Sequence, residues 1–347
     1  IIKIIYNTLN MSKKKQIHLF FRKPFFGLNF SIENFYLELI KNFQHKDVEF
    51  KVKVCPLESK GLLNRILITI WAFFNQGDVN HICGDVNFIA FFLNKKKTIN
   101  TILDHASLIR LKGIKKFIYY LLWVKIPVLK SAHIITISDK TKKEILKYTT
   151  VNKNKITVSG VCIHNVYKKK IKAFYQKKPK ILIIGTRDNK NIKNILMSLS
   201  DIHCELIIIG NLIEEYVFIL KKFKISYKNY VGLNNKAIFK KYTESDLLMF
   251  PSQYEGFGMP ILEAQTVGRV VVTSNLEPMT SVGGNGALYV NPYNVKNMNI
   301  TVKKVIDNKS LRKKLIQNGF KNTKRFNKEE ILKKHLDCYL SILKNSF

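Results

Sequence analysis

The sequence predicts an α/β protein with two domains, each built around a parallel sheet that helices cover on both faces. The chain has 347 residues, which exceeds one average domain and fits two. Its hydrophobic fraction of 46% is enough for real cores and excludes a disordered protein. Short apolar runs typical of buried strands alternate with segments typical of helices, and this alternation predicts parallel sheets.

The first half of the chain shows apolar runs of strand length, separated by segments of helical character. Strands are expected at residues 16–21, 50–55, 79–83, 98–103, 134–137 and 156–159. Helices are expected at 31–43 and 139–148. The apolar runs 66–74 and 117–123 fall short of the ~18–20 residues that span a bilayer, so they are interpreted as core or half-buried helices.

The second half repeats the alternation of strands and helices. Strands are expected at 180–185, 204–210, 230–233 and 246–250. Helices are expected at 192–199, 213–223, 237–244, 310–322 and 328–344. A charged and weakly periodic segment precedes residue 180, and its composition suits a linker between two domains.

The chain is strongly basic, with a formal net charge of +35. The basic residues are nearly all lysines spread along the whole sequence, which predicts a solvated surface and no specific nucleic-acid partner. An anionic membrane surface is a secondary expectation. Its candidate contact is the basic amphipathic segment 111–130, in which lysines at 112, 115, 116 and 125 stand beside aromatic residues.

The cysteines and the start of the chain bear on its cellular location. The cysteines are odd in number and widely spaced, so they are expected to be reduced, mostly buried thiols of a cytoplasmic protein. No signal layout or transmembrane anchor is recognised, which predicts a cytoplasmic protein, with peripheral attachment to the inner face of the membrane as an extension. Two expectations stand for the start of the chain: residues 1–10 are an upstream extension, or Met11 is the natural start.

The stretch from Phe250 to Pro292 carries the most specific pattern of the chain. Its centre is the string Pro251-Ser252-Gln253-Tyr254-Glu255-Gly256-Phe257-Gly258-Met259-Pro260-Ile261-Leu262-Glu263-Ala264. The string predicts a strand end, a glycine loop and a helix, which places the loop at the carboxyl edge of a sheet. Loop amides there suit a diphosphate, and Glu255 and Glu263 can accept hydrogen bonds from sugar hydroxyls. The alternative is a plain turn with incidental carboxylates.

This string resembles the signature of the family 4 (group 1) retaining glycosyltransferases, which have the GT-B fold. Residues 268–275 and 286–292 are similar to the strand and loop that follow in that family. The resemblance implies two Rossmann-like domains whose parallel sheets face a central cleft. The implied parts are an N-terminal acceptor domain at residues 12–163 and a linker at 164–179. They are followed by a C-terminal nucleotide-sugar donor domain at 180–327 and a helix at 328–347 that crosses back to the first domain.

The resemblance also implies roles for individual residues. Lys190 matches the lysine of the family's diphosphate-clamping loop, and Arg187 stands one position late for its arginine. Gly27 resembles a glycine that approaches the donor phosphate, and Asp104 keeps a place at the sugar. Catalytic roles are expected for Glu255, Lys190 and Asp104. Donor-binding roles are expected for Gly27, Arg187, Lys190, Glu255, Gly256, Phe257, Gly258, Met259, Pro260, Ile261 and Glu263.

The implied activity is transfer of a hexose, with retention, from a UDP- or GDP-sugar to a hydroxyl group. The implied acceptor is a glycan or lipid-linked molecule of cell-surface polysaccharide biosynthesis. No Asp-x-Asp occurs, so a metal-clamped diphosphate is not suggested, and no cofactor is expected. Glu255 is placed at the donor sugar and Glu263 at the ribose.

Two other functions stay open for the sequence. A sugar epimerase of the same fold would need acid/base carboxylates and histidines that the sequence does not reveal. A catalytically decayed GT-B protein would act as a polybasic partner of membrane or nucleic acid. Leu103 stands where relatives carry histidine, and Ser281 stands where they carry glutamate. These two departures from the family pattern are the reason for the second alternative. Release of a nucleoside diphosphate from a donor would distinguish the transferase from it.

Overall fold

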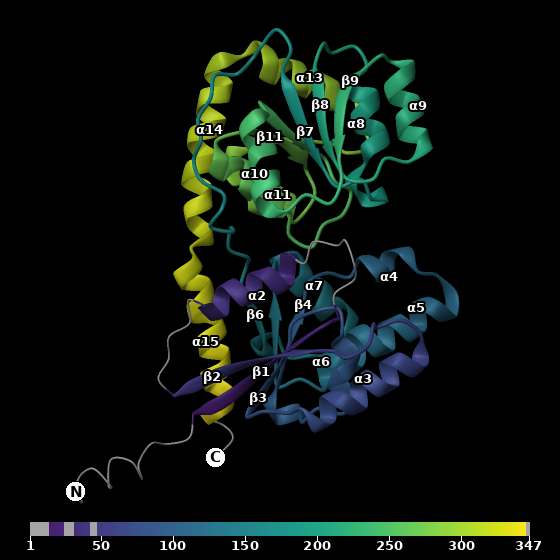
Figure 1. The fold of residues 1–347 in the computed structure, drawn as a ribbon, viewed down its shortest axis with the longest axis vertical. Helices are drawn as coiled ribbons and strands as arrows, with labels where there is room; N and C mark the ends of the chain where they lie inside the picture. Colours follow the sequence, from purple (N-terminus) through teal and green to yellow (C-terminus); the bar gives the residue numbers. More distant parts are fainter. Residues whose placement is uncertain (1–13, 24–30, 42–46, 345–347) are drawn as a thin grey trace, which may run out of the picture. The chain divides into compact units, whose positions relative to one another are not determined.

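The structure is a computed structural model, and it describes residues 14–23, 31–41 and 47–344 (Figure 1). The chain forms two compact units, each of which is described by itself. Unit 1 consists of Ile1–Ile137, Thr141–Ser159 and Leu332–Phe347. Unit 2 consists of Ser138–Lys140 and Gly160–Ile331. The predicted α/β architecture is confirmed, because each unit holds a parallel sheet of six strands.

The sheet of unit 1 has the strand order β2-β1-β3-β4-β5-β6, and every neighbouring pair is parallel. Its strands are β1 (Lys15–Phe21), β2 (Val48–Val54), β3 (Val79–Ile82), β4 (Thr98–Ile102), β5 (His133–Thr136) and β6 (Ile156–Val158). Strands β3 and β4 are buried along their whole length, which explains why their sequences show no polar alternation. The predicted strands of this half are confirmed to within two residues at each end.

Helices and short helical turns connect the strands of unit 1. They are α2 (Ser31–Lys41), α3 (Leu62–Phe74), η1 (Asn87–Phe91), η2 (Lys95–Lys97), α4 (Ala106–Arg110), α5 (Gly113–Tyr119), η3 (Tyr120–Lys125), α6 (Ile126–Leu129), α7 (Asp139–Tyr148) and η4 (Lys153–Lys155). The last helix, α15 (Lys328–Lys344), adds its residues from Leu332 to this unit. The Tyr339 hydroxyl lies 2.8 Å from Nδ1 of the buried His81 on β3, which ties α15 to the sheet.

The sheet of unit 2 has the strand order β12-β11-β10-β7-β8-β9, again with parallel neighbours. Its strands are β7 (Lys180–Ile184), β8 (Glu205–Ile209), β9 (Ser226–Tyr230), β10 (Leu247–Phe250), β11 (Val270–Ser274) and β12 (Leu288–Val290). The strand predicted at 230–233 is wrong, because β9 ends at Tyr230. Gly232 with φ 70° turns the chain away there.

Helices and short helical turns separate the strands of unit 2 and follow the last of them. They are η5 (Asp188–Lys190), α8 (Ile192–Ser198), α9 (Glu214–Lys222), α10 (Asn235–Glu244), α11 (Met259–Val267), α12 (Met279–Gly283), η6 (Gly284–Gly286), α13 (Val295–Asp307), α14 (Lys309–Thr323) and η7 (Lys324–Phe326). The core between sheet and helices contains Ile183, Leu206 and Val272 from the strands and Leu196 and Val302 from the helices. Helix α13 was not predicted, and its Met298, Val302 and Val305 are buried at helical spacing.

Two features bear on the predictions about cysteines and membrane spans. All five cysteines are free and buried, which confirms the prediction of buried thiols. In the described part of the chain, no helix combines the length and the apolar character that crossing a bilayer requires. The predictions for Gly27 and for residues 1–10 lie outside the described residues.

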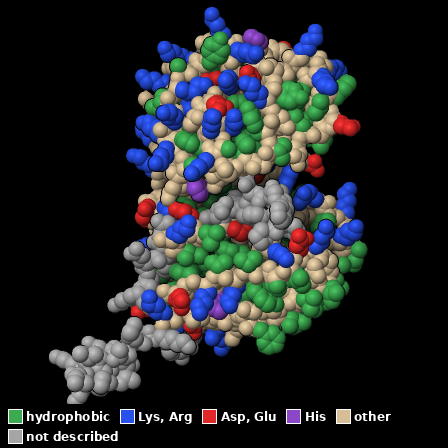
Figure 2. All heavy atoms as spheres, in the orientation of Figure 1, with side chains coloured by type: hydrophobic (Ala, Val, Ile, Leu, Met, Phe, Trp, Pro, Cys, Tyr) green, Lys and Arg blue, Asp and Glu red, His purple; other side chains and the backbone are tan. Residues whose placement is uncertain are grey.

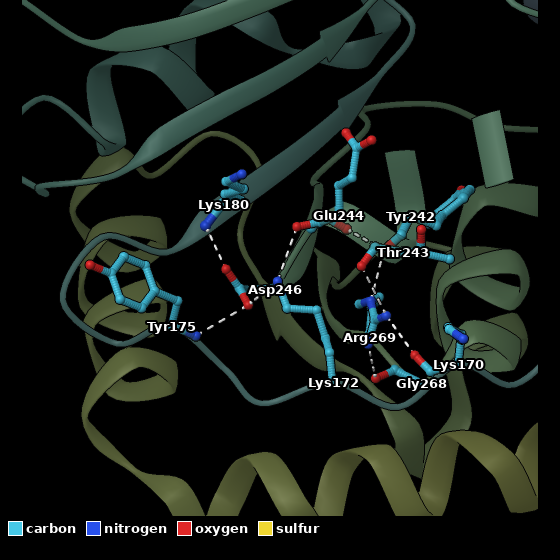
Figure 3. A network of polar contacts seen from close by, with 11 residues as sticks. Lys170, Lys172, Tyr175, Lys180, Tyr242, Thr243, Glu244, Asp246, Gly268 and Arg269 are labelled. Atoms are coloured by element: carbon cyan, nitrogen blue, oxygen red, sulfur yellow. Dashed lines mark hydrogen bonds and ion pairs between the residues drawn. The ribbon is translucent and has the colours of Figure 1, made fainter. Parts of the chain in front are cut away.

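A buried polar network fastens the segment before β7 to the body of unit 2 (Figure 3). Asp246 accepts hydrogen bonds from the backbone N–H groups of Lys180, at 2.8 Å, and Tyr175, at 3.2 Å. Lys172 Nζ lies 2.8 Å from the same carboxylate. Nearby, the buried Arg269 guanidinium donates to the backbone carbonyl of Lys170 at 2.6 Å. Two buried charges, those of Asp246 and Arg269, therefore hold the irregular connection 170–180 in place.

We predict that Asp246→Ala destabilises unit 2 by about 2–4 kcal/mol, because two backbone donors and one ammonium lose their acceptor. The measurement is the free energy of unfolding by denaturant. Asp201→Ala is the matched control, since Asp201 pairs with Lys303 at 2.7 Å on the exposed surface. That change is expected to cost less than about 1 kcal/mol. Equal losses in the two variants would contradict a structural role for the Asp246 network.

Candidate functional site

Two loops meet at the carboxyl edge of the sheet in unit 2. Residues 185–191 follow β7, and residues 251–258 follow β10, which is the neighbour of β7 in the sheet. The Gln253 backbone N–H donates to the Asn189 carbonyl at 2.8 Å, so the two loops are hydrogen-bonded to each other. Because parallel strands end at the same edge, the structure brings together the two loops that the sequence had marked separately.

Lys190 and Glu255 form the central ion pair of these loops. Lys190 Nζ lies 2.6 Å from Glu255 Oε1, and only 16% and 14% of the two side chains are exposed. The ammonium also lies 4.5 Å from the ring centroid of Phe250. A Cβ atom on Gly185 would stand 2.9 Å from Lys190 Cε, so this glycine leaves the space through which the lysine side chain passes. The Lys190 side chain is therefore closely packed against Gly185 and Phe250.

Asn189 and Asn191 flank Lys190 in the sequence, and their side chains hydrogen-bond to the neighbouring loops. Asn189 donates from Nδ2 to the Tyr254 carbonyl at 2.8 Å and to Glu255 Oε1 at 3.3 Å. Asn191 donates from Nδ2 to the Pro292 carbonyl at 2.6 Å and to the Pro251 carbonyl at 3.2 Å. Its backbone is left-handed, with φ 63°, which asparagine tolerates better than most residues. Sequence reasoning missed both roles, although an Asn on each side of Lys190 was a visible signal.

Glu263 lies on α11 and is held by tyrosines that no motif indicated. The Tyr242 hydroxyl donates to Glu263 Oε2 at 2.7 Å and lies 3.2 Å from the Pro260 carbonyl. Burial of the carboxyl group raises the pKa of Glu263 to about 7, while hydrogen bonds from Tyr242 and Tyr167 and the charge of Lys190 act in the opposite direction. Burial also raises the pKa of both phenols, so they remain donors. Glu263 therefore titrates near neutral pH.

The other residues predicted on the glycine loop shape the entry to α11. Gly258 is buried and has φ 101°, a conformation that strains any residue with a Cβ. Phe257 is buried and packs edge-on against the Phe326 ring at 5.7 Å. Gly256 is partly buried before this turn. Met259 and Pro260 open α11, and Ile261 is fully buried, so this part of the string builds the loop while Glu255 and Glu263 carry its charge.

Two predicted site residues remain, Arg187 in unit 2 and Asp104 in unit 1. Arg187 is exposed on the loop after β7. Asp104 belongs to unit 1, where it is exposed after β4 and accepts the Ala106 backbone N–H at 2.8 Å. The neighbouring His105 is buried, and its Nδ1 lies 3.2 Å from Glu144 Oε2 on α7. No group of three His, Cys, Asp or Glu side chains suited to a metal ion occurs among the residues that the structure describes.

Sequence comparisons identify relatives of this site-bearing region. Residues 167–322 match the family model of the glycosyl transferases group 1. The O-antigen chain mannosyltransferase RfbU of Salmonella typhimurium is 30% identical over 201 residues, which cover 54% of this chain and 55% of that protein. The capsular polysaccharide biosynthesis glycosyltransferase CapM of Staphylococcus aureus is 26% identical over 291 residues, covering 76% and 75%. The match thus spans about half the length of the Salmonella relative.

Structural comparisons concern the fold of the whole chain. HepE of Anabaena, solved in complex with UDP and glucose, has a TM-score of 0.74 at 13% identity, with 94% of this chain and 100% of that chain covered. A glycosyltransferase from Rickettsia africae has a TM-score of 0.70 at 17% identity, covering 96% and 100%. These likenesses, together with the two six-stranded parallel sheets, confirm the predicted GT-B fold. Residues 167–322 of the chain are therefore similar to the group 1 glycosyltransferases.

Proposed function

We propose that this chain transfers a hexose from a UDP- or GDP-sugar to a hydroxyl group of a glycan or lipid-linked acceptor in cell-surface polysaccharide biosynthesis. We further propose that the anomeric configuration is retained and that no metal is required. The relatives named for O-antigen and capsule synthesis support the acceptor class. The cytoplasm is the proposed compartment, because nucleotide sugars are the proposed donors.

The observation that carries this proposal is the ion pair of Lys190 and Glu255 on two hydrogen-bonded loops at the carboxyl edge of unit 2. One loop supplies a fixed ammonium, and the other supplies a carboxylate and the start of α11. A diphosphate needs a cationic hydrogen-bond donor, and a sugar needs acceptors for its hydroxyl groups. The pair offers both within one hydrogen-bond length.

The proposed chemistry assigns one role to each charged side chain. When the bond between the anomeric carbon and the diphosphate breaks, the departing phosphate gains charge, and Lys190 and the backbone amides at the start of α11 stabilise it. Glu255 accepts hydrogen bonds from the donor sugar, and Glu263 accepts them from the ribose. The acceptor oxygen bonds to the anomeric carbon, and its proton passes to a phosphate oxygen of the leaving group. Asp104 is proposed to contact sugar from unit 1.

The test of the proposed function is a panel of UDP- and GDP-sugars. A ligand that binds only the native state raises the melting temperature, so the true donor should be found by thermal shift. The protein should then slowly release nucleoside diphosphate from that donor in the presence of EDTA, and NMR of the transferred sugar should show retention. A protein that binds no nucleotide sugar and hydrolyses none would be the catalytically decayed alternative.

We predict that Lys190→Ala lowers kcat by about 10²–10³-fold, because the lost ammonium acts most strongly on the charge that develops in the transition state. The binding affinity for the donor should fall much less. Lys193→Ala is the matched control, since Lys193 pairs with Glu215 on the exposed surface and should keep the wild-type rate. A wild-type kcat in a folded Lys190 variant would remove this residue from the site.

We predict that binding of the donor's nucleoside diphosphate weakens about tenfold between pH 8 and pH 6. The pKa of Glu263 is about 7, so the carboxylate that accepts the ribose hydroxyls is protonated at the lower pH. Titration calorimetry of wild type and Glu263→Gln measures the effect, because the ligand's own titration is common to both proteins. The variant should bind more weakly at pH 8 and lose most of the pH dependence. Identical pH profiles would contradict the ribose assignment.

A further inference from the structure

Helix α3 of unit 1 is apolar on the side that faces solvent as well as on the side that faces the core. Ile68, Thr69 and Ala72 are buried on its inner side. Phe74 is 76% exposed and Leu62 is 69% exposed. The large exposed side chains of α3 are Leu62, Leu63, Ile66, Leu67, Ile70, Phe73 and Phe74. Their spacing of three, four and seven positions places them along one side of the helix. Arg65, the single charged residue of the element, lies outside this side and is partly buried.

The helical segment 113–129 adds a second exposed apolar surface. Helices α5, η3 and α6 follow one another in it without a break in helical backbone. Ile114 is 70% exposed and Phe117 is 55% exposed. The lysines at 112, 115, 116 and 125 are all exposed as well. This surface therefore mixes large apolar side chains with cationic ones.

The two apolar surfaces belong to neighbouring elements. The Arg65 guanidinium of α3 lies 4.7 Å from the ring centroid of Trp123 on η3. Trp123 in turn stacks on Tyr119 of α5, with ring centroids 5.4 Å apart and planes 8° from parallel. Figure 2 shows hydrophobic side chains gathered over the part of unit 1 where Figure 1 labels α3 and α5. We call the exposed side chains of residues 62–74 and 112–118 the apolar-basic face.

The segments that carry this face have charges of one sign, although Asp85 and Asp104 lie near Tyr119 at its edge. Residues 59–77 and 105–138 contain no Asp or Glu, and the second of these segments carries Arg110 and five lysines. Exposed apolar side chains in such number mark an interaction site, because water disfavours them on a free surface. A second copy of this chain would bring lysines against lysines and is disfavoured by their repulsion. An anionic bilayer supplies the opposite charge and an apolar interior.

We propose that the apolar-basic face docks unit 1 on an anionic lipid bilayer, with α3 and α5 lying at the level of the headgroups. Leu63, Phe74 and Phe117 enter the acyl boundary, while the lysines extend along their aliphatic stems to the phosphate groups. This placement gives a function to the exposed apolar side of α3, which takes no part in the core that the described residues of unit 1 form. It is independent of the proposed function, because binding to lipid requires no nucleotide sugar.

The experiment is co-sedimentation of the full chain with vesicles of phosphatidylcholine alone and of phosphatidylcholine mixed with phosphatidylglycerol. Wild type should bind the anionic vesicles, and salt should weaken the binding because it screens charges beyond ~8–10 Å. Lys115→Gln with Lys116→Gln should lower partitioning about fivefold for each lysine removed, the factor that corresponds to about 1 kcal/mol per charge. Leu63→Ser with Phe74→Ser should lower it at least about tenfold.

Matched controls come from exposed side chains of unit 2. Phe218→Ser with Ile300→Ser removes two apolar side chains that are 65% and 54% exposed. Lys221→Gln with Lys222→Gln removes two exposed lysines from α9. All four double variants alter exposed residues and should keep the wild-type melting temperature. The two control variants should partition like wild type, which shows that the effect depends on the position of the residues and not on total charge.

Three results would overturn the docking proposal. The first is a wild-type protein that stays in solution with anionic vesicles at low salt. The second is an equal loss of partitioning in the control pairs, which would indicate general attraction of a basic chain to anionic lipid. The third is a dimer, seen by sedimentation velocity without lipid, that the Leu63 and Phe74 changes dissociate, because the face would then bind a second copy. None of these results affects the thermal-shift test of the nucleotide-sugar site.

Discussion

The candidate site depends on two side-chain amides that fasten one loop of unit 2 to another. Asn191 takes up a left-handed backbone and, from the same position, donates to the carbonyls of Pro251 and Pro292. Asn189 donates to the Tyr254 carbonyl. A short amide side chain meets both demands, since it tolerates this backbone conformation and reaches nearby carbonyls. Lys190 stands between the two, so its backbone is fixed by covalent neighbours that are themselves hydrogen-bonded across the sheet edge.

The central strands of unit 2 were predictable because they are parallel and buried, which makes their sequences continuous apolar runs, as in β7, β8 and β10. The prediction failed at β9, an edge strand with the sequence Ser-Tyr-Lys-Asn-Tyr, because exposed backbone pairing needs no apolar side chains. Helix α13 was missed for a different reason. Its buried Met298, Val302 and Val305 stand among lysines and asparagines, and the periodicity is visible only when the polar majority is set aside.

The charged residues of the glycine loop were predictable because their motif is local in the sequence. The partners of those residues were not, because contacts between separate elements leave no local pattern. Tyr242 lies on α10, twenty-one positions from Glu263, and donates a hydrogen bond to its carboxylate. No rule on residue spacing predicts this contact. The surface of α3 shows the same limit. A helix with apolar residues on both sides has the same sequence whether its outer side is packed or exposed, so only the fold separates the two cases.

Charge balance links the ion pair to the proposed ligand. Lys190 and Glu255 are both mostly buried, and each would be costly to desolvate without the other. In the protein alone, the ammonium is therefore already held in place and neutralised by its partner. A diphosphate that arrives at Lys190 exchanges one anionic neighbour for another, so little new ordering of the side chain is required. In the proposed function, Glu255 is then free to accept hydrogen bonds from sugar hydroxyls. One ion pair would thus provide both the cation for the leaving group and the acceptor for the sugar.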